Sequence, residues 1–349
     1  MVWKYVDIFE KCCASLAILI NFIVLYLVIF KSPKQIGGYK ALLIYITLFE
    51  LFYSVLNSLS PTEAFTTESG FIVVMDQRNS FLPVNVFIVL FFTMYGTSLV
   101  NFAVHFIFRY LALTSSEPLI LIMWISIPLF LGSVYTVALY YFMSESKVME
   151  QFLRLLTGFE NLLNSCEFRK KMLDIYPNVT ITELSYMGFY MYPIDGSGSQ
   201  YINWHGISGV LVVSSVITTS LSIMFYFGVK CRIQLKELAN MSTVSDKYNA
   251  IQHQLFAALV LQTVIPLILM HMPSLFIALT CFADSSLKSM GPICCVCIAL
   301  YTVLDPLPNI FVIRSYRKAF LNLIRCNKSK TTKRSTIVPT GQSTIPTSS

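Results

Sequence analysis

The chain has 349 residues, of which 55% are hydrophobic and 12% are charged. This composition excludes an ordinary soluble domain and predicts a protein embedded in a membrane. The net charge of +7 does not indicate a nucleic-acid-binding surface, because most of the excess lies in short segments that flank apolar runs, where it would face anionic lipid.

Sequence signals of catalysis are missing. The four histidines have no metal-ligand spacing, and the chain contains no Walker loop, dinucleotide fingerprint or nucleophile elbow. We therefore expect no enzymatic activity, no cofactor and no metal.

Seven long apolar runs account for most of the chain. At about 1.5 Å rise per residue, roughly 20 residues cross a hydrocarbon core of about 30 Å. Only helices and closed barrels satisfy their own backbone groups in lipid, so the runs predict an all-α seven-helix bundle over residues 1–326. The predicted helices are 12–30, 41–59, 83–108, 119–143, 206–229, 254–282 and 291–313, then a short amphipathic helix at 315–325 and a disordered tail at 327–349.

The charges between the runs predict the orientation. With the amino terminus outside, the cytoplasmic segments hold 16 bases and three acids, as expected when Lys and Arg near helix ends stay inside. Asn178 begins an Asn-Val-Thr glycosylation sequon that falls in the long outer loop under this topology. We therefore predict an outer N-terminus, a cytoplasmic C-terminus and a sugar on Asn178.

Helices one, two and seven each carry a polar side chain at a similar depth. Asn21, Glu50 and Asp305 all lie about 14 Å from the inner end of their helix. Charges inside a bilayer are costly, so these groups need polar partners or an aqueous cavity. Two interpretations stay open: a proton- or cation-sensitive switch, and a hydrogen-bond cluster that only holds the helices together.

Arg109 lies at the inner end of helix three, beside Tyr110. An arginine at a helix end is often only an anchor that reaches the membrane surface. Helical spacing alone does not separate that role from a functional one.

Helix six contains Pro266 and Pro273, and helix seven contains Pro306 and Pro308. Proline removes a backbone donor and clashes with the preceding turn, so both helices are predicted to bend. Such a bend serves either as a hinge or as a static kink.

The outer halves of helices three, five, six and seven offer an apolar, aromatic lining with a few polar groups. Such a lining suits a small, largely apolar ligand, although aromatic and methionine stripes are equally typical of packing. The candidate residues are Asn85, Phe92, Tyr95, Ser208, Met270, His271 and Tyr301.

Cys326 follows the basic amphipathic segment after helix seven. A cysteine at this place is a candidate for palmitate on the inner leaflet.

Several of these motifs together resemble the nematode seven-transmembrane chemoreceptors of the serpentine receptor class r, or Str, family. The segment 305–311 (Asp-Pro-Leu-Pro-Asn-Ile-Phe), followed by 316–318 (Tyr-Arg-Lys), resembles the seventh-helix signature of that family. Agreement extends to 31–33 and 39–40 in the first inner loop, to 105–110 at the end of helix three and to the two prolines of helix six. The resemblance covers nearly everything up to Cys326.

The resemblance implies a G-protein-coupled receptor that detects odorants or other small environmental molecules, in the plasma membrane of sensory cilia on chemosensory neurons. Phe108 stands where rhodopsin-like receptors have an acid before the arginine, and Asn309 stands where they have a tyrosine. No cysteine lies near the outer end of helix three. The residues implied to meet a heterotrimeric G protein are Arg109, Tyr110, Lys230, Arg232 and Lys236.

The alternative is a seven-helix ligand-gated cation channel. It would place the amino terminus inside, which the distribution of charges and the Asn178 sequon oppose. A transporter is a more distant alternative, because no internal repeat and no broken midplane helix is evident.

Overall fold

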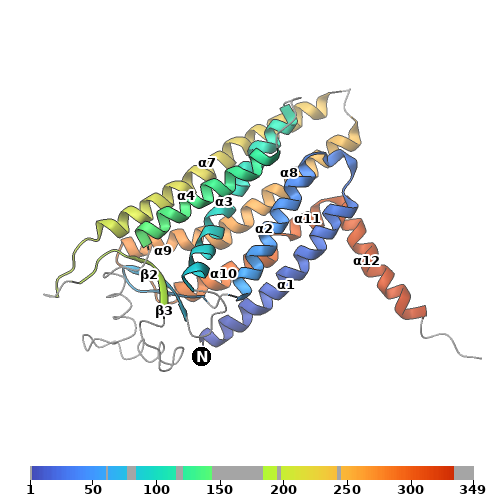
Figure 1. Cartoon of the computed structure of the whole chain (residues 1–349). Helices are drawn as coiled ribbons and strands as arrows, with labels where there is room; N and C mark the ends of the chain where they lie inside the picture. The colour runs from blue at the N-terminus through green and yellow to red at the C-terminus, as the bar shows by residue number, and fades with distance from the viewer. Residues whose placement is uncertain are drawn as a thin grey trace, which may run out of the picture.

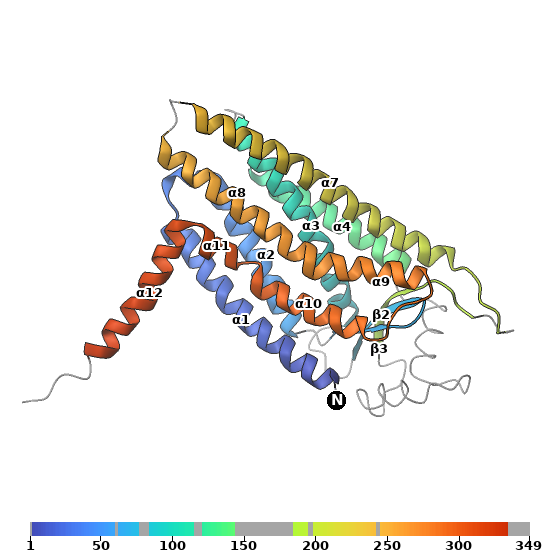
Figure 2. The ribbon, with the colours of Figure 1, turned by 180° about the vertical axis from the view of Figure 1, so that it is seen from behind.

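The computed structural model describes residues 2–59, 62–76, 84–114, 121–143, 184–194, 198–241 and 245–333. Within these residues, seven helical spans are long and apolar enough to cross a membrane. They lie side by side in one bundle, with the N-terminus at the end that carries a small β-sheet (Figures 1 and 2). We call this end the outer end, following the charge distribution, and the opposite end the inner end.

Several helices, among them the first, second, third and fifth, continue past an end of the predicted run, because hydrogen bonding along a helix continues into its polar ends. The first five spans are α1 Val2–Lys31, α2 Tyr39–Leu59, α3 Val84–Thr114, α4 Leu121–Met143 and α7 Trp204–Asn240. The sixth comprises α8 Asp246–Pro266, η3 Leu267–His271 and α9 Met272–Phe282, and the seventh comprises α10 Met290–Leu304 and α11 Leu307–Val312. A short 3-10 turn, η1 Lys34–Ile36, joins α1 to α2.

The sixth span is irregular between its two prolines. The segment η3 is a π-helix, in which Met272 N–H donates to the carbonyl of Leu267, five residues earlier. Pro273 has no N–H for the carbonyl four residues before it, so the regular α-helical ladder cannot continue there. A π-helical turn widens the backbone and is frequent at functional sites.

The seventh span is interrupted at Asp305 and Pro306, and it ends where Ile313 adopts an extended conformation. The amphipathic helix α12, Arg314–Lys333, then leaves the bundle (Figure 1). Its helical structure continues to Lys333, past the predicted end at 325, and disorder of the tail stays a prediction. The remaining tail, 334–349, lies outside the described residues.

Three antiparallel strands cover the outer end and were not predicted. They are β1 Thr62–Thr66, β2 Gly70–Asp76 and β3 Leu184–Tyr190, in the order β1-β2-β3. The β-branched run at 72–74 is the sequence signal for β2. Phe71 pairs with Phe189, and their ring centroids are 5.8 Å apart. The sheet thus presents apolar side chains at one end of the bundle.

Helix α3 is the central helix of the bundle. It packs against α2, α4, α7 and α8, while α1 packs against α2 and α10. Where α3 meets α4, a Cβ on Gly96 would overlap the ring of Tyr135. Glycine at this position therefore lets Tyr135 lie against the backbone of α3.

Candidate functional site

A cavity of about 180 Å³ lies in the outer half of the bundle, beneath the sheet. Its walls come from α3, α4, α7, α9 and α10, and strands of the sheet form its outer side. None of the described residues that line it carries a formal charge. Six rings contribute to the walls: Phe71, Phe91, Phe92, Tyr95, Tyr135 and Phe189. Such walls suit an uncharged ligand that is mostly apolar.

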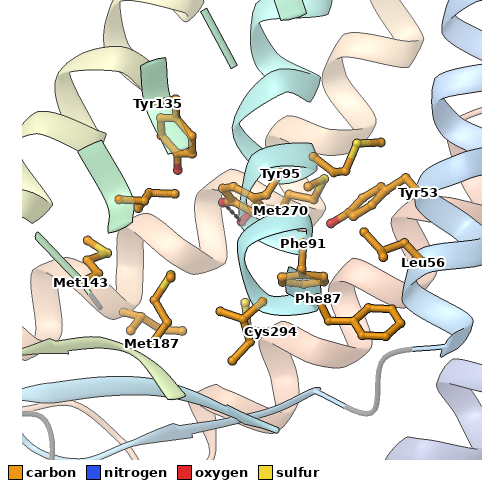
Figure 3. Packing of buried hydrophobic residues seen from close by; sticks show 14 of the residues in the cluster. Tyr53, Leu56, Phe87, Phe91, Tyr95, Tyr135, Met143, Met187, Met270 and Cys294 are labelled. Carbon is orange, nitrogen blue, oxygen red and sulfur yellow. Dashed lines mark hydrogen bonds between the residues drawn. The ribbon is translucent and has the colours of Figure 1, made fainter. Parts of the chain in front are cut away.

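A few polar groups interrupt the apolar walls. The Tyr95 hydroxyl donates to Ser274 Oγ at 2.9 Å and lies 3.2 Å from the carbonyl of Met270, in η3. Ser274 Oγ also donates to that carbonyl, at 2.8 Å. Tyr95 therefore links the central helix α3 to the π-helical turn of the sixth span (Figure 3).

Tyr135 provides a second hydroxyl, which points inward from α4 (Figure 3). Among the described residues, it has no hydrogen-bond partner. Ser214 and Thr218 also line the cavity from α7, but the Thr218 hydroxyl is bonded to the backbone carbonyl of Ser214. The Tyr135 hydroxyl is thus available to one polar group of a ligand.

Of the predicted ligand-binding residues, Phe92 and Tyr95 line the cavity. Met270 and Tyr301 are buried in the surrounding core cluster, and the ring of His271 lies edge-on to Tyr95, with centroids 5.1 Å apart. Ser208 is half-buried and bonds the backbone carbonyl of Trp204. These four do not belong to the lining, and the side chain of Asn85 lies outside the described residues.

The predicted polar centre is buried within the bundle. The side chains of Glu50 and Asp305 lie next to each other, and none of their four buried oxygens has a hydrogen-bond partner among the described residues. Two carboxyl groups can hydrogen-bond only when one of them carries a proton as a donor. Asn21 instead donates to the carbonyl of Ala17 on its own helix, at 3.1 Å, and its side-chain oxygen has no described partner.

Arg109 faces the inside of the bundle, with only 2% of its surface exposed. Its Nη2 donates to the backbone carbonyl of Gln252 on α8, at 2.8 Å. The guanidinium carbon lies 5.1 Å from the centroid of the Tyr39 ring on α2. Arg109 is therefore no surface anchor: it joins the inner ends of α2, α3 and α8.

The other predicted G-protein contacts lie on α3, next to Arg109 in the sequence, and on the inner part of α7. Tyr110 is half-buried against Phe227 of α7, with ring centroids 5.6 Å apart. Lys230 lies 5.7 Å from the ring centroid of Tyr226. Arg232 and Lys236 are exposed on the inner part of α7.

A further contact at the inner end joins α12 to Ser32, the residue that follows α1. The hydroxyls of Tyr316 and Ser32 share a hydrogen bond of 2.7 Å. Burial raises the pKa of Tyr316 to about 12, although this hydrogen bond opposes the rise. The phenol therefore stays neutral at physiological pH.

Two predicted modification sites cannot be placed. Asn178 lies outside the described residues. Cys326 belongs to α12, but its side chain lies outside them as well.

Comparison with known proteins identifies the family. The family described as "Serpentine type 7TM GPCR chemoreceptor Str" matches residues 6–321. The chain belongs to the Str family. The resemblance seen in the sequence motifs is thereby confirmed, and a receptor family agrees with the expected lack of enzymatic activity.

Two curated Str relatives match over most of their length. The protein described as "G-protein coupled receptor str-217" of Caenorhabditis elegans is 29% identical over 331 residues, covering 90% of this receptor and 88% of that protein. "Serpentine receptor class r-10" of Caenorhabditis elegans is 26% identical over 353 residues, covering 98% and 97%.

A solved structure of squid rhodopsin is similar in fold. It superposes with a TM-score of 0.55 and 12% sequence identity, covering 98% of this chain and 93% of that chain. At this identity the likeness concerns the fold alone. The predicted seven-helix, receptor-like fold is thereby confirmed.

Proposed function

We propose that this Str receptor binds a small neutral molecule in the outer cavity and, in response, activates a heterotrimeric G protein. The observation that carries the proposal is the Tyr95 contact, which joins the wall of an uncharged cavity to the π-helical turn of the sixth span. A ligand in the cavity touches the same tyrosine that holds helix six against helix three.

The outer half of helix six would change position when a ligand competes for the Tyr95 hydroxyl. A ligand that accepts a hydrogen bond from Tyr95 removes a donor from Ser274 and from the Met270 carbonyl. The π-helical turn lacks a regular backbone ladder, so it can adjust without breaking a full set of helical hydrogen bonds. Different affinities for two bundle arrangements then shift their populations.

At the inner end, the same movement would separate α8 from Arg109. The guanidinium is held by one carbonyl of α8 and one ring of α2, and among the described residues no acid lies beside it. Displacement of α8 would leave Arg109 and Tyr110 exposed next to the cations of α7, Lys230, Arg232 and Lys236. Together they would form a basic surface for a G protein.

We also propose a role for Glu50 and Asp305 in this change. Their carboxyl groups lie beside each other where helix two meets helix seven, at the place where Pro306 interrupts the seventh span. Two buried carboxyl groups can stay adjacent and share a hydrogen bond only while at least one of them is protonated, so a change in their protonation would favour separation of the helices. Asn21, on the neighbouring helix one, would then provide a partner for a released carboxyl group.

A cell-based assay tests the proposal. Cells that express the receptor with a calcium or cyclic-nucleotide reporter are exposed to a panel of small neutral compounds. An active compound should lose its effect in Ala278→Phe, which fills the cavity, and keep it in Ala257→Phe, a change on the exposed face of α8 away from the cavity. Responses that survive complete removal of G-protein function would refute the proposal.

The location implied by the family and the modifications predicted from the sequence motifs belong to the same proposal. We expect the receptor in the plasma membrane of sensory cilia, with sugar on Asn178 and palmitate on Cys326. Enzymatic deglycosylation that shifts the wild type but not Asn178→Gln would place that loop outside. Sugar on Asn327, which begins another sequon in the tail, would reverse the orientation.

A further inference from the structure

The outer side of the cavity is covered. Four of the five lining residues from the sheet, Ala64, Val73, Gly188 and Phe189, are buried, and the fifth, Phe71, is half-buried. Figures 1 and 2 show the sheet lying across the outer end of the bundle. Among the described residues, the sheet therefore stands between the cavity and the water above it.

Hydrogen bonds fasten this cover to the loop between α9 and α10. Ser286 N–H donates to the carbonyl of Glu68, at 3.0 Å, and Thr66 Oγ1 donates to the carbonyl of Leu287, at 2.7 Å. A Cβ on Gly291 would overlap the carbonyl of Ala64, so α10 also packs directly on β1. The loop between α9 and α10 and the start of α10 thus both hold β1 and the turn after it.

Within the described part of the chain, the cavity reaches the surface at the side of the bundle, and not at its outer end. Among its described lining residues, only Thr218 on α7 and Leu275 on α9 are exposed, and Leu275 is 42% exposed. Helix α7 packs along α3 and α4, whereas its contacts with α9 are sparse. Figure 2 views the bundle from the side on which α7, α8 and α9 lie.

This opening lies at the depth of the hydrocarbon core. Leu275 is seven residues before the outer end of α9 at Phe282, which corresponds to about 10 Å. Thr218 lies twelve residues into the apolar run that begins at Gly206, or about 18 Å. An opening at these depths faces lipid acyl chains.

We infer that ligands enter this cavity sideways from the bilayer, between α7 and α9, and are therefore neutral molecules that partition into lipid. The inference rests on the proposed function and specifies its ligand. A cavity of about 150 Å³ holds benzene, so one of about 180 Å³ accepts on the order of ten non-hydrogen atoms. The hydroxyls of Tyr135 and Tyr95 offer one polar group of the ligand a partner. A charged molecule is excluded twice, by the lipid on its path and by the uncharged walls.

Two native cysteines in the wall allow entry to be measured without a known ligand. Cys294 and Cys295 line the cavity, whereas Cys297 on the same helix is half-buried and does not. The purified full-length receptor in lipid nanodiscs is treated with N-ethylmaleimide, which is neutral, soluble in lipid and small enough for the cavity. Tandem mass spectrometry then gives the alkylation rate at each cysteine, with Cys297 as internal reference. No G protein or agonist is needed, so the result is independent of whether the receptor signals.

Variants at the opening should change that rate in both directions. We expect Leu275→Trp to slow alkylation of Cys294 and Cys295 about tenfold, which corresponds to a barrier raised by about 1.4 kcal/mol, and Leu275→Ala to speed it. The matched control is Leu279, which is exposed on α9 but absent from the lining. The same two substitutions there should leave all rates near wild type. Thr218→Trp tests the opposite side if Leu275→Trp does not fold.

Two results would overturn the inference. One is equal rates in the Leu275 and Leu279 variants. The other is modification of Cys294 by a trimethylammonium methanethiosulfonate as fast as by the neutral methyl methanethiosulfonate, when each rate is divided by that reagent's rate with a free thiol in water. The permanently charged reagent cannot cross lipid, so equal normalised rates would reveal an aqueous path.

Discussion

Replacing Tyr39 by leucine tests whether its ring holds Arg109 in the resting arrangement. The guanidinium carbon is 5.1 Å from the ring centroid, and the two residues are 4% and 2% exposed. A cation–π contact that is desolvated to this degree is worth about 2 kcal/mol. Since 1.4 kcal/mol corresponds to a factor of ten, the equilibrium toward the open arrangement should rise roughly thirtyfold.

The effect should appear as activity without ligand. If the open arrangement makes up about 1% of the resting receptor, a thirtyfold shift raises it to roughly 20%. The measurement is basal G-protein signalling in cells, divided by the amount of receptor at the surface. Loss of packing alone would reduce the melting temperature of the purified receptor without raising this ratio.

Tyr39→Phe is the matched control, because it removes the hydroxyl and keeps the ring. Its basal signal should stay close to that of the wild type. If the leucine and phenylalanine variants have the same basal signal, the ring does not hold Arg109 and the proposed release of the arginine is wrong.

Three further changes test the pair of Glu50 and Asp305, the contact of Tyr95 with helix six and the packing of the sheet on α10. Glu50→Ala leaves Asp305 buried without its partner and should cost about 1–3 kcal/mol of stability. Glu50→Gln keeps a hydrogen-bonding partner and should cost less. Equal melting temperatures of the two variants would contradict the pairing. Tyr95→Phe removes a hydrogen bond worth about 1 kcal/mol, so amide hydrogen exchange at 267–274 should accelerate while exchange in α1 does not. Unchanged exchange rates at 267–274 would show that Tyr95 does not stabilise the π-helical turn. Gly291→Ala places a Cβ on a backbone carbonyl of β1 and should destabilise the receptor by about 1–3 kcal/mol. The control is Gly38→Ala, whose Cβ meets nothing within 4 Å. Equal thermal stability of the two variants would argue against close packing of β1 on α10.

The sequence alone determined the seven spans and the family. Each apolar run has to satisfy its backbone in lipid, so its length is enough to predict a helix, and the motif around Asp305 and Pro306 identifies the receptor class. The two prolines of helix six likewise predicted an irregular helix, because the missing N–H groups are visible in the sequence. These features depend on local chemistry.

Only the tertiary structure decided how the site is assembled. Arg109 donates to the backbone carbonyl of Gln252. Because every residue has such a carbonyl, the side chains of the sequence do not identify this partner. Tyr135 and Ser274 join Tyr95 at the cavity through the relative rotation of three helices, which helical periodicity within each one does not specify. The sheet over the cavity pairs strands more than a hundred residues apart, and such pairing depends on where the bundle brings their loops together.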